Sequence, residues 1–222
     1  DRDCSMFIEA CRVKRPIRVP SSFSKNAILK IETSVFRSSA VGKRNYAMTL
    51  LASRLGLRAS DIANLQFGDI DWDNSLITLT MKKTQKVIQL PLLTEVGNAI
   101  IDYLKNGRPK SNLKSVFLSS RAPYTGATKA CVCAAINGII VRSGVDINLK
   151  HHGPHSLRHS LASAMLQDET SLPVISESLG HRHTDTTMIY LKIDITSLMK
   201  CALPVPSVSE GFYTQRGGAF YE

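Results

Sequence analysis

The sequence lacks an apolar run long enough to cross a membrane, and it lacks a secretory signal peptide. Its 222 residues are 43% hydrophobic, but no segment approaches the ~18 consecutive apolar residues that a membrane-spanning helix needs. These absences argue against a membrane or secreted class and predict a cytoplasmic globular protein that does not bind membranes. The first residue is Asp1 rather than Met, which predicts a fragment of a longer protein.

Motifs for disulfides, metals and nucleotides are also missing. The five cysteines form no CxxC pair, so we expect free thiols in a reducing compartment rather than a disulfide framework or a zinc site. The nucleotide-binding pattern GxxxxGK[ST] does not occur. His155 and His159 are spaced like the histidines of HExxH, but Ser156 stands where that motif has glutamate. The sequence therefore predicts no metal and no other cofactor.

Positive charge is what the sequence has in excess. Lys and Arg number 28 against 18 Asp and Glu, which gives a net charge of +10. Such a balance favours a polyanionic partner, nucleic acid above all, although charge alone does not separate DNA from RNA or lipid headgroups. The segment from Cys11 to Pro20 places four basic residues around two prolines. It indicates an extended linker or, on composition alone, a solvated strand.

Hydrophobic periodicity predicts an α+β fold, a mostly helical domain with a small antiparallel β-hairpin sheet. Helices are expected in "SSFSKNAILKIETS", "GKRNYAMTLLASRLG", which Gly56 ends, and "SDIANL", for which Ser60 is the expected N-cap. Later helices are expected from Thr94, over residues 128–142, from Pro154, in "LPVISESLG" and around Thr187. Between the two groups, "DIDWDN" indicates a short strand with a turn at Asn74, and "LITLTM" and "VIQLPL" indicate a hairpin. Its tip "KKTQK" has three lysines and no glycine, so we expect it to be solvated and mobile.

The segment "HHGPHSLRHSLASAML" predicts a helix with an unusual beginning. Its core stripe is expected to consist of Leu157, Leu161, Ala164 and Met165. His155 and Arg158, three residues apart, are expected to share a different face near the helix N-terminus, where unpaired backbone N–H groups point outward. A histidine and an arginine at such a position suit an anion, and the candidate is a phosphate.

Four motifs occur in order: "GLRASDIANL", "MKKTQK", "HSLRH" and "LGHRHTDTTMIY". Together they resemble the tyrosine recombinase (phage integrase) family, over the region from about Gly56 to Lys192. The resemblance implies a DNA strand-exchange enzyme of bacterial, phage or mobile-element origin. Such an enzyme is a site-specific recombinase that cleaves and rejoins double-stranded DNA through a 3′-phosphotyrosyl intermediate, without metal or ATP. The resemblance also implies a homotetramer assembled on specific recombination sites.

The resemblance places six catalytic residues on this sequence. They are Arg58, Lys83, His155, Arg158, His181 and Tyr190. The lysine is the loosest of these assignments, because counting forward from Arg58 favours Lys82 and counting back from Pro91 favours Lys83. We select Lys83, with Lys82 next and Lys86 third.

The chemistry of phosphodiester cleavage explains why these residue types are needed. Guanidinium groups stay charged and can hold the phosphate oxygens as negative charge redistributes, which suits Arg58 and Arg158. A tyrosine hydroxyl has an ordinary pKa of about 10, so Tyr190 needs a proton acceptor such as His155 or a cationic setting. Lys83 can protonate the leaving 5′ oxygen. His181 is expected to hydrogen-bond the phosphate.

The expected domain organisation has three parts. Residues 1–20 are a basic linker from a missing N-terminal DNA-binding domain, residues 21–200 are the catalytic domain, and residues 201–222 are a tail that protomers exchange. Two alternatives remain open. One is a type IB topoisomerase that relaxes supercoils, and the other is a catalytically silent DNA-binding module.

Overall fold

The structure is a computed structural model that describes residues 21–147 and 152–180. Its helices are α1 (Lys25–Thr33), α2 (Ala40–Arg54), α3 (Ala59–Asn64), the short 3-10 helix η2 (Phe67–Asp69), α4 (Thr94–Asn106), α5 (Lys129–Arg142), α6 (Pro154–Gln167) and α7 (Leu172–Ser178). The strands β1 (Ile70–Asp71), β2 (Leu76–Thr80) and β3 (Val87–Pro91) form one antiparallel sheet in that order. The predicted α+β class is therefore confirmed. The helix expected around Thr187 lies outside the described residues.

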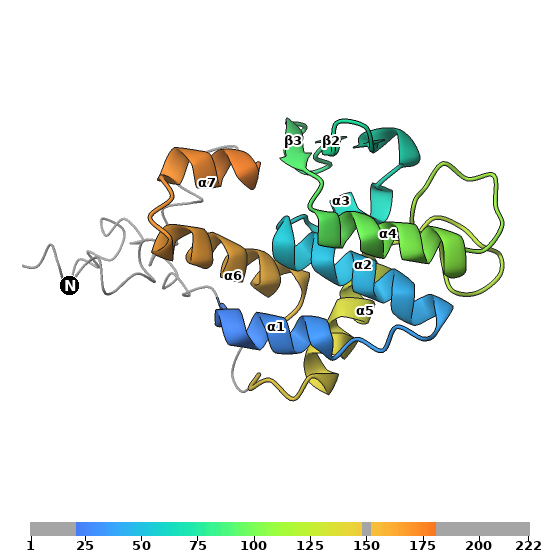
Figure 1. Ribbon diagram of the computed structural model, residues 1–222, viewed down its shortest axis with the longest axis horizontal. Helices are drawn as coiled ribbons and strands as arrows, with labels where there is room; N and C mark the ends of the chain where they lie inside the picture. The colour runs from blue at the N-terminus through green and yellow to red at the C-terminus, as the bar shows by residue number, and fades with distance from the viewer. Residues whose placement is uncertain (1–20, 148–151, 181–222) are drawn as a thin grey trace, which may run out of the picture.

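Helix α2 forms the centre of the helical layer, where α1, α4, α5 and α6 all contact it (Figure 1). Every residue of α2 from Ala47 to Ser53 is buried, because neighbouring helices cover this part of the helix on several sides. The Ser39 side chain accepts a hydrogen bond from the Gly42 amide at 3.0 Å and so caps the helix N-terminus. The helix ends just before Gly56, as predicted.

The β2–β3 hairpin has a simple alternating pattern. Ile77 pairs with Leu90 and Leu79 pairs with Ile88, and all four side chains are buried against the helices. The hairpin tip, residues 82–86, is closed by a hydrogen bond from the Met81 amide to the Lys86 carbonyl at 2.9 Å. Its three lysines are exposed, as predicted. The mobility of the tip stays a prediction.

Helix α6 differs from its predicted pattern in one important respect. Leu157 joins the main core, and Leu161 and Met165 pack in a second small cluster formed with Ile175 of α7. This confirms the predicted apolar stripe in outline. However, Arg158 is only 1% exposed, whereas His155, three residues before it, is exposed, and the spacing did not predict this difference. The helix is covered on more sides than a single apolar stripe suggests, because α1, α2, α5 and α7 all contact it.

The predicted N-cap of α3 was also wrong. The helix begins at Ala59, with Arg58 in the N-cap position, and Ser60 is its second residue. No side chain caps this helix, and the Arg58 carbonyl instead accepts the amides of Asp61 and Ile62 at 2.9 and 3.0 Å. The helix therefore starts two residues earlier than predicted, and Arg58 lies at its N-terminal end.

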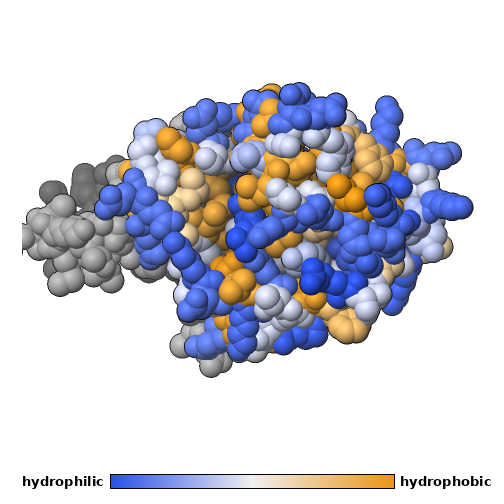
Figure 2. Space-filling view, in the orientation of Figure 1, coloured by the Kyte–Doolittle hydropathy of each residue, from blue (hydrophilic) through white to orange (hydrophobic). Residues whose placement is uncertain are grey.

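The surface is rich in charged and polar residues. Hydrophilic residues project along most of the outline in Figure 2, and apolar residues lie between them nearer the middle of the face. In the described part of the chain, no helix is long and apolar enough to span a membrane. Cys131 and Cys133, both on α5, are free thiols as predicted.

Candidate functional site: a cationic cavity at the start of α6

A cavity of about 610 Å³ lies where the start of α3, the hairpin tip, α5 and the start of α6 meet. Its lining residues are Arg58, Ala59, Ser60, Lys82, Lys83, Lys129, Cys133, Asn137, His152, Gly153, Pro154 and His155. Four of them carry a permanent positive charge, two are histidines, and none is an aspartate or glutamate. A concave surface lined only by cations and neutral groups is suited to an anion.

Arg58 is positioned by the chain on both sides of it. Its backbone is extended and holds the start of α3. Its guanidinium donates to the sulfur of Met81 at 3.1 Å, and Met81 is fully buried directly before the hairpin tip. Arg58 therefore lies beside the hairpin lysines, although Lys83 is 25 positions away in the sequence.

Arg158 lies behind this cavity and joins three segments of the chain. Its guanidinium donates to the backbone carbonyl of Gly56 at 2.6 Å and to the carbonyl of Leu179. Gly56 lies two residues before Arg58, and Leu179 lies two residues before His181. A buried guanidinium bonded to carbonyl dipoles retains its full charge, because those contacts orient it without neutralising it.

Two glycines allow these segments to approach. Gly56 has φ +62°, and a Cβ atom there would lie 2.8 Å from a methyl carbon of Leu179. Gly180 has φ +59°, and a Cβ atom there would overlap the sulfur of Met81. Both positions need a left-handed backbone and have no room for a side chain. The loop before Arg58 can therefore pack against Leu179 at the end of α7. Gly180, directly after Leu179, can in turn pack against the hairpin at Met81.

The electrostatic setting of His155 links four of the predicted residues. Its pKa is lowered, first because the surrounding protein desolvates the ring, and then by the positive charges of Arg158, Arg58 and Lys83. These charges act on His155 only because the three residues lie near it. The lowered pKa keeps the imidazole neutral at pH 7, so that it can accept a proton. His155 is exposed at the cavity, so the proton acceptor is accessible.

His159 packs against His155, with ring centroids 4.4 Å apart and ring planes tilted by 58°. Burial lowers the pKa of His159 to about 4, and His155 and Arg158 contribute to the shift. The two histidines have the spacing of the HExxH motif, which lacks its glutamate here because Ser156 occupies that position. Among the described residues, however, no group of three or more His, Cys, Asp or Glu side chains could hold a metal ion.

The pKa of His159 predicts acid sensitivity of the fold. Because the ordinary value is 6.5 and the folded value is about 4, the unfolded state binds more protons between these pH values, and stability falls as the pH drops through this window. Between pH 7.5 and pH 4.5 the loss from this group amounts to roughly 2–3 kcal/mol. Urea unfolding at the two pH values should show that His159→Phe loses less stability than the wild type. An equal loss in both proteins would contradict the assignment.

The hairpin lysines are held at the cavity by a buried carboxylate. Asp61 is only 4% exposed, and its Oδ1 accepts a hydrogen bond from the Lys82 amide at 3.0 Å. Asp61 lies three residues after Arg58 in the same short helix, so it connects that helix to the hairpin tip. Lys82 and Lys83 both line the cavity, and the positive charge of Lys83 contributes to the lowered pKa of His155. The selection of Lys83 over Lys82 stays a prediction.

Of the six predicted residues, the structure brings Arg58, Lys83, His155 and Arg158 together. The other two, His181 and Tyr190, lie outside the described residues. Sequence reasoning missed several residues of the site, namely Asp61, Lys129, Cys133, Asn137 and His152. An aspartate in the first turn of a short helix gives a weak sequence signal for Asp61. The residues of α5 gave none, because only the packing of α5 beside α3 and α6 brings them to the cavity.

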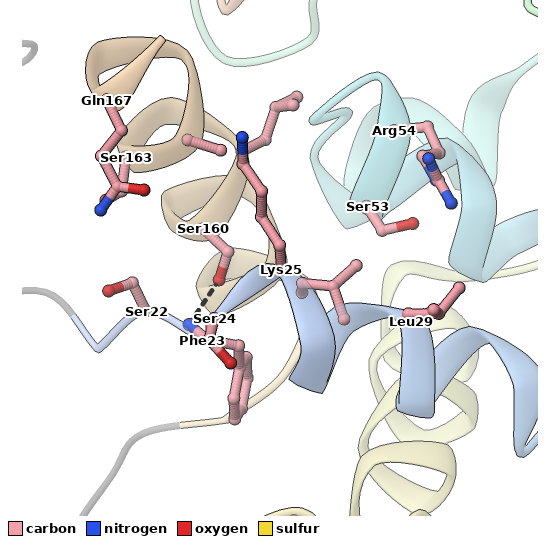
Figure 3. A pocket seen from close by; sticks show the side chains of 13 residues that line it. Ser22, Phe23, Ser24, Lys25, Leu29, Ser53, Arg54, Ser160, Ser163 and Gln167 are labelled. Atoms are coloured by element: carbon pink, nitrogen blue, oxygen red, sulfur yellow. Dashed lines mark hydrogen bonds between the residues drawn. The ribbon is translucent and has the colours of Figure 1, made fainter.

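A second cavity, of about 540 Å³, lies between α1, the end of α2 and α6 (Figure 3). Its polar lining is dominated by serine hydroxyls, and Ser160 accepts a hydrogen bond from the Phe23 amide at 2.7 Å. Lys25 pairs there with Asp168 at 2.8 Å, and Arg54 pairs with Glu32 at 2.6 Å. The cations of this cavity are thus already neutralised.

Comparison with known proteins identifies the class. The family model described as "Phage integrase family" matches residues 24–196. The chain therefore belongs to the phage integrase family, as the four sequence motifs predicted.

Three similar proteins illustrate the relationship. Two are proteins of Sinorhizobium fredii named as integrase/recombinases. One of them, y4rA, is 38% identical over 86% of this chain and 46% of its own length. The other, y4gC, is 34% identical over 85% of this chain and 97% of its own length. A crystal structure of the XerH site-specific recombinase, bound to a palindromic difH substrate in a post-cleavage complex, has a TM-score of 0.68 at 22% identity. The matched region covers 83% of the present chain and 53% of the XerH chain. The present chain therefore spans about half the length of y4rA and of the XerH chain.

Proposed function

We propose that the chain is the catalytic part of a site-specific recombinase, which cleaves and rejoins double-stranded DNA through a 3′-phosphotyrosyl intermediate on Tyr190. The observation that carries the proposal is the cavity at the start of α6, with four permanent cations and no carboxylate in its lining. The membership in the phage integrase family and the likeness to a DNA-bound recombinase support the same conclusion.

In the proposed cleavage step, the Tyr190 oxygen attacks the scissile phosphorus. Arg58 and Arg158 hold the non-bridging oxygens while negative charge redistributes over them. The phenol proton passes to His155, which is neutral at pH 7 because its pKa is lowered. The bond from phosphorus to the 5′ oxygen breaks, and Lys83 gives that oxygen a proton.

The reverse of this step rejoins the DNA. A 5′ hydroxyl attacks the phosphotyrosyl phosphorus, the bond to Tyr190 breaks, and the protons return to Tyr190 and Lys83. The phosphotyrosyl bond conserves the energy of the phosphodiester, so the proposed cycle consumes no ATP and uses no metal. His181 hydrogen-bonds the phosphate during both steps.

The proposal is tested with a nicked duplex whose cleaved fragment diffuses away, so that the covalent intermediate accumulates. The duplex carries the recombination site of the genetic element that encodes the protein. We expect a protein–DNA adduct that survives denaturation and forms equally in EDTA. Absence of the adduct on a verified site, with the full-length protein, would favour the silent DNA-binding module. Relaxation of supercoiled plasmid without strand exchange would favour the topoisomerase alternative.

The buried carboxylate of Asp61 should affect this activity through the hairpin. In Asp61→Leu the Lys82 amide loses its acceptor, and the loss of this hydrogen bond costs about 1 kcal/mol. We expect adduct formation in a single turnover to fall about tenfold or more, because Lys83 is no longer held at the cavity. Asp61→Asn keeps an oxygen at the same place and should retain most of the activity. If both variants are equally impaired, the hydrogen bond to Lys82 is not the cause.

The remaining parts of the chain have proposed roles of their own. Residues 1–20 form a basic linker from an N-terminal DNA-binding domain, residues 21–200 the catalytic domain, and residues 201–222 a tail exchanged between protomers of a tetramer on DNA. The apolar residues of "LMKCALPV" at the start of the tail motivate the exchange. Truncation after Lys200 should therefore weaken assembly on DNA in sedimentation experiments, and unchanged assembly would count against it.

A further inference from the structure

Met81 lies at a junction between segments of the proposed active site. It comes directly after β2 and directly before the hairpin tip, and its side chain is fully buried. It does not line the cationic cavity, and none of the steps proposed above uses it. Its contacts nevertheless reach the hairpin tip, Arg58 and Gly180, which precedes His181 in the sequence. The placement of this one residue therefore bears on several parts of the site.

The backbone of Met81 closes the hairpin tip. Its amide donates to the Lys86 carbonyl at 2.9 Å, and its carbonyl accepts the Gln85 amide at 2.8 Å. Both hydrogen-bonding groups of this peptide unit are thus used within the turn. Lys83, the proposed proton donor, lies inside the segment that they close. The backbone of Met81 therefore anchors the hairpin lysine.

The side chain of Met81 orients the Arg58 guanidinium. Its sulfur accepts a hydrogen bond from the Arg58 Nη1 at 3.1 Å. A thioether is a weak acceptor, but its sulfur is polarizable and suits contact with a cation. It is also neutral, so it holds one N–H of Arg58 without cancelling the positive charge that is proposed to face the phosphate. A carboxylate in the same place would neutralise that charge.

The sulfur of Met81 is enclosed by its neighbours. A Cβ atom built on Gly180 would overlap this sulfur and would lie 3.1 Å from a methyl carbon of Ile88 in β3. The Met81 side chain thus occupies the space that a side chain at position 180 would need. A side chain packed in this way keeps one position, so the fold fixes the direction in which the sulfur offers its lone pairs to Arg58.

We propose that Met81 is a positioning residue of the recombinase, whose sulfur aims the Arg58 guanidinium at the scissile phosphate. It acts through Arg58 and does not touch the DNA. A displacement of a reacting group by about 1 Å can cost about 10²-fold in rate, so a weak acceptor can matter more for the rate than for stability. This inference rests on the proposed function and adds a residue that supports the same site.

The test compares Met81→Leu with Met81→Gln in single-turnover adduct formation, with the full-length protein and a nicked duplex that carries its verified site. Leucine has about the volume of methionine but no acceptor. Glutamine keeps the unbranched shape and offers an amide oxygen to Arg58. We expect the rate to fall about tenfold in Met81→Leu and less than about threefold in Met81→Gln.

Stability should change in the opposite order. A buried glutamine at position 81 leaves amide N–H groups without partners, so Met81→Gln should unfold at a lower urea concentration than Met81→Leu. The more stable variant is then the slower enzyme. A purely structural role of Met81 would instead make the rate follow the stability.

Met48→Leu is the matched control. Met48 is also fully buried, but it lies on α2 and does not line the cavity, so this variant should form the adduct at the wild-type rate. Arg58→Lys, alone and combined with Met81→Leu, completes a double-mutant cycle. Because Met81 acts through the guanidinium, Met81→Leu should slow the Arg58→Lys protein by less than about twofold.

The outcomes separate this inference from the proposed function. A wild-type rate in Met81→Leu, or equal losses in Met81→Leu and Met81→Gln, overturns the role of the sulfur and leaves the recombinase proposal intact. An equal loss in Met48→Leu, or an undiminished effect of Met81→Leu in the Arg58→Lys protein, overturns it as well. Wild-type protein that forms no adduct on the verified site overturns the proposed function, and this inference with it.

Discussion

Tyr190→Phe is expected to form no covalent adduct with the nicked duplex, a fall of at least about 10⁴-fold, comparable to the loss when another enzyme's nucleophile is removed. The substitution removes one oxygen atom, the atom that forms the bond to phosphorus in the proposed cleavage step. The other five candidate residues cannot replace it, because their proposed roles are to hold charge or to move protons. Denaturing gel electrophoresis of the trapped complex measures the effect directly.

DNA binding separates loss of chemistry from loss of the protein fold in this variant. Affinity for the duplex should change by less than about twofold, because the cations of the cavity are untouched. Tyr124→Phe provides the matched control, since Tyr124 is an exposed tyrosine that does not line the cavity. It should behave as the wild type. An adduct that persists in Tyr190→Phe would assign the covalent bond to another side chain and refute the proposed mechanism.

Arg158→Lys is expected to lose about 10²–10³-fold in the rate of adduct formation, although the net charge is unchanged. The loss of one well-placed donor at a developing negative charge has this magnitude in other enzymes. The Arg158 guanidinium also donates to the carbonyls of Gly56 and Leu179. A lysine ammonium is a compact charge without the planar fork, so it cannot hold both carbonyls and face the phosphate at once.

The same substitution should lower the free energy of unfolding by about 1–3 kcal/mol, because a buried carbonyl is left without a donor. Urea unfolding measures this loss of stability. The rate of adduct formation is then compared between the variant and the wild type under conditions well below the unfolding transition, where both proteins are folded. Arg121→Lys is the control, since Arg121 is exposed in the loop before α5. An Arg158→Lys protein that is destabilised but cleaves DNA at the wild-type rate would show that Arg158 serves the fold alone.

The two arginines of the site differ in how far the sequence predicted their surroundings. Both were selected from their motifs, Arg58 from "GLRASDIANL" and Arg158 from "HSLRH". The spacing rule for helices placed Arg158 on one face with His155, but it did not predict that Arg158 is buried. Such rules describe one helix with one covered face, whereas α6 is covered from several directions. Whether a side chain of α6 is buried then depends on which other helices pack against it, and the sequence of α6 alone does not contain that information.

Local preferences were most reliable where a single segment decides its own conformation. The helices, the hairpin and the Gly56 stop follow from periodicity and from the backbone freedom of glycine, which act over a few neighbouring residues. The prediction of a Ser60 cap was wrong because the backbone carbonyl of Arg58 already accepts the first helical amides, so α3 starts at Ala59.

The sequence by itself determined the proposed chemistry, since the residue types that can hold a phosphate and move its protons are present in four ordered motifs. It also determined the α+β class, because hydrophobic periodicity is a local property. Only the tertiary structure decided that Asp61 holds the hairpin, that His159 packs on His155 as a neutral ring, and that Lys129 and Asn137 of α5 reach the cavity. These contacts join residues brought together by the packing of whole helices, and a side chain's pKa and hydrogen bonds depend on all the groups around it.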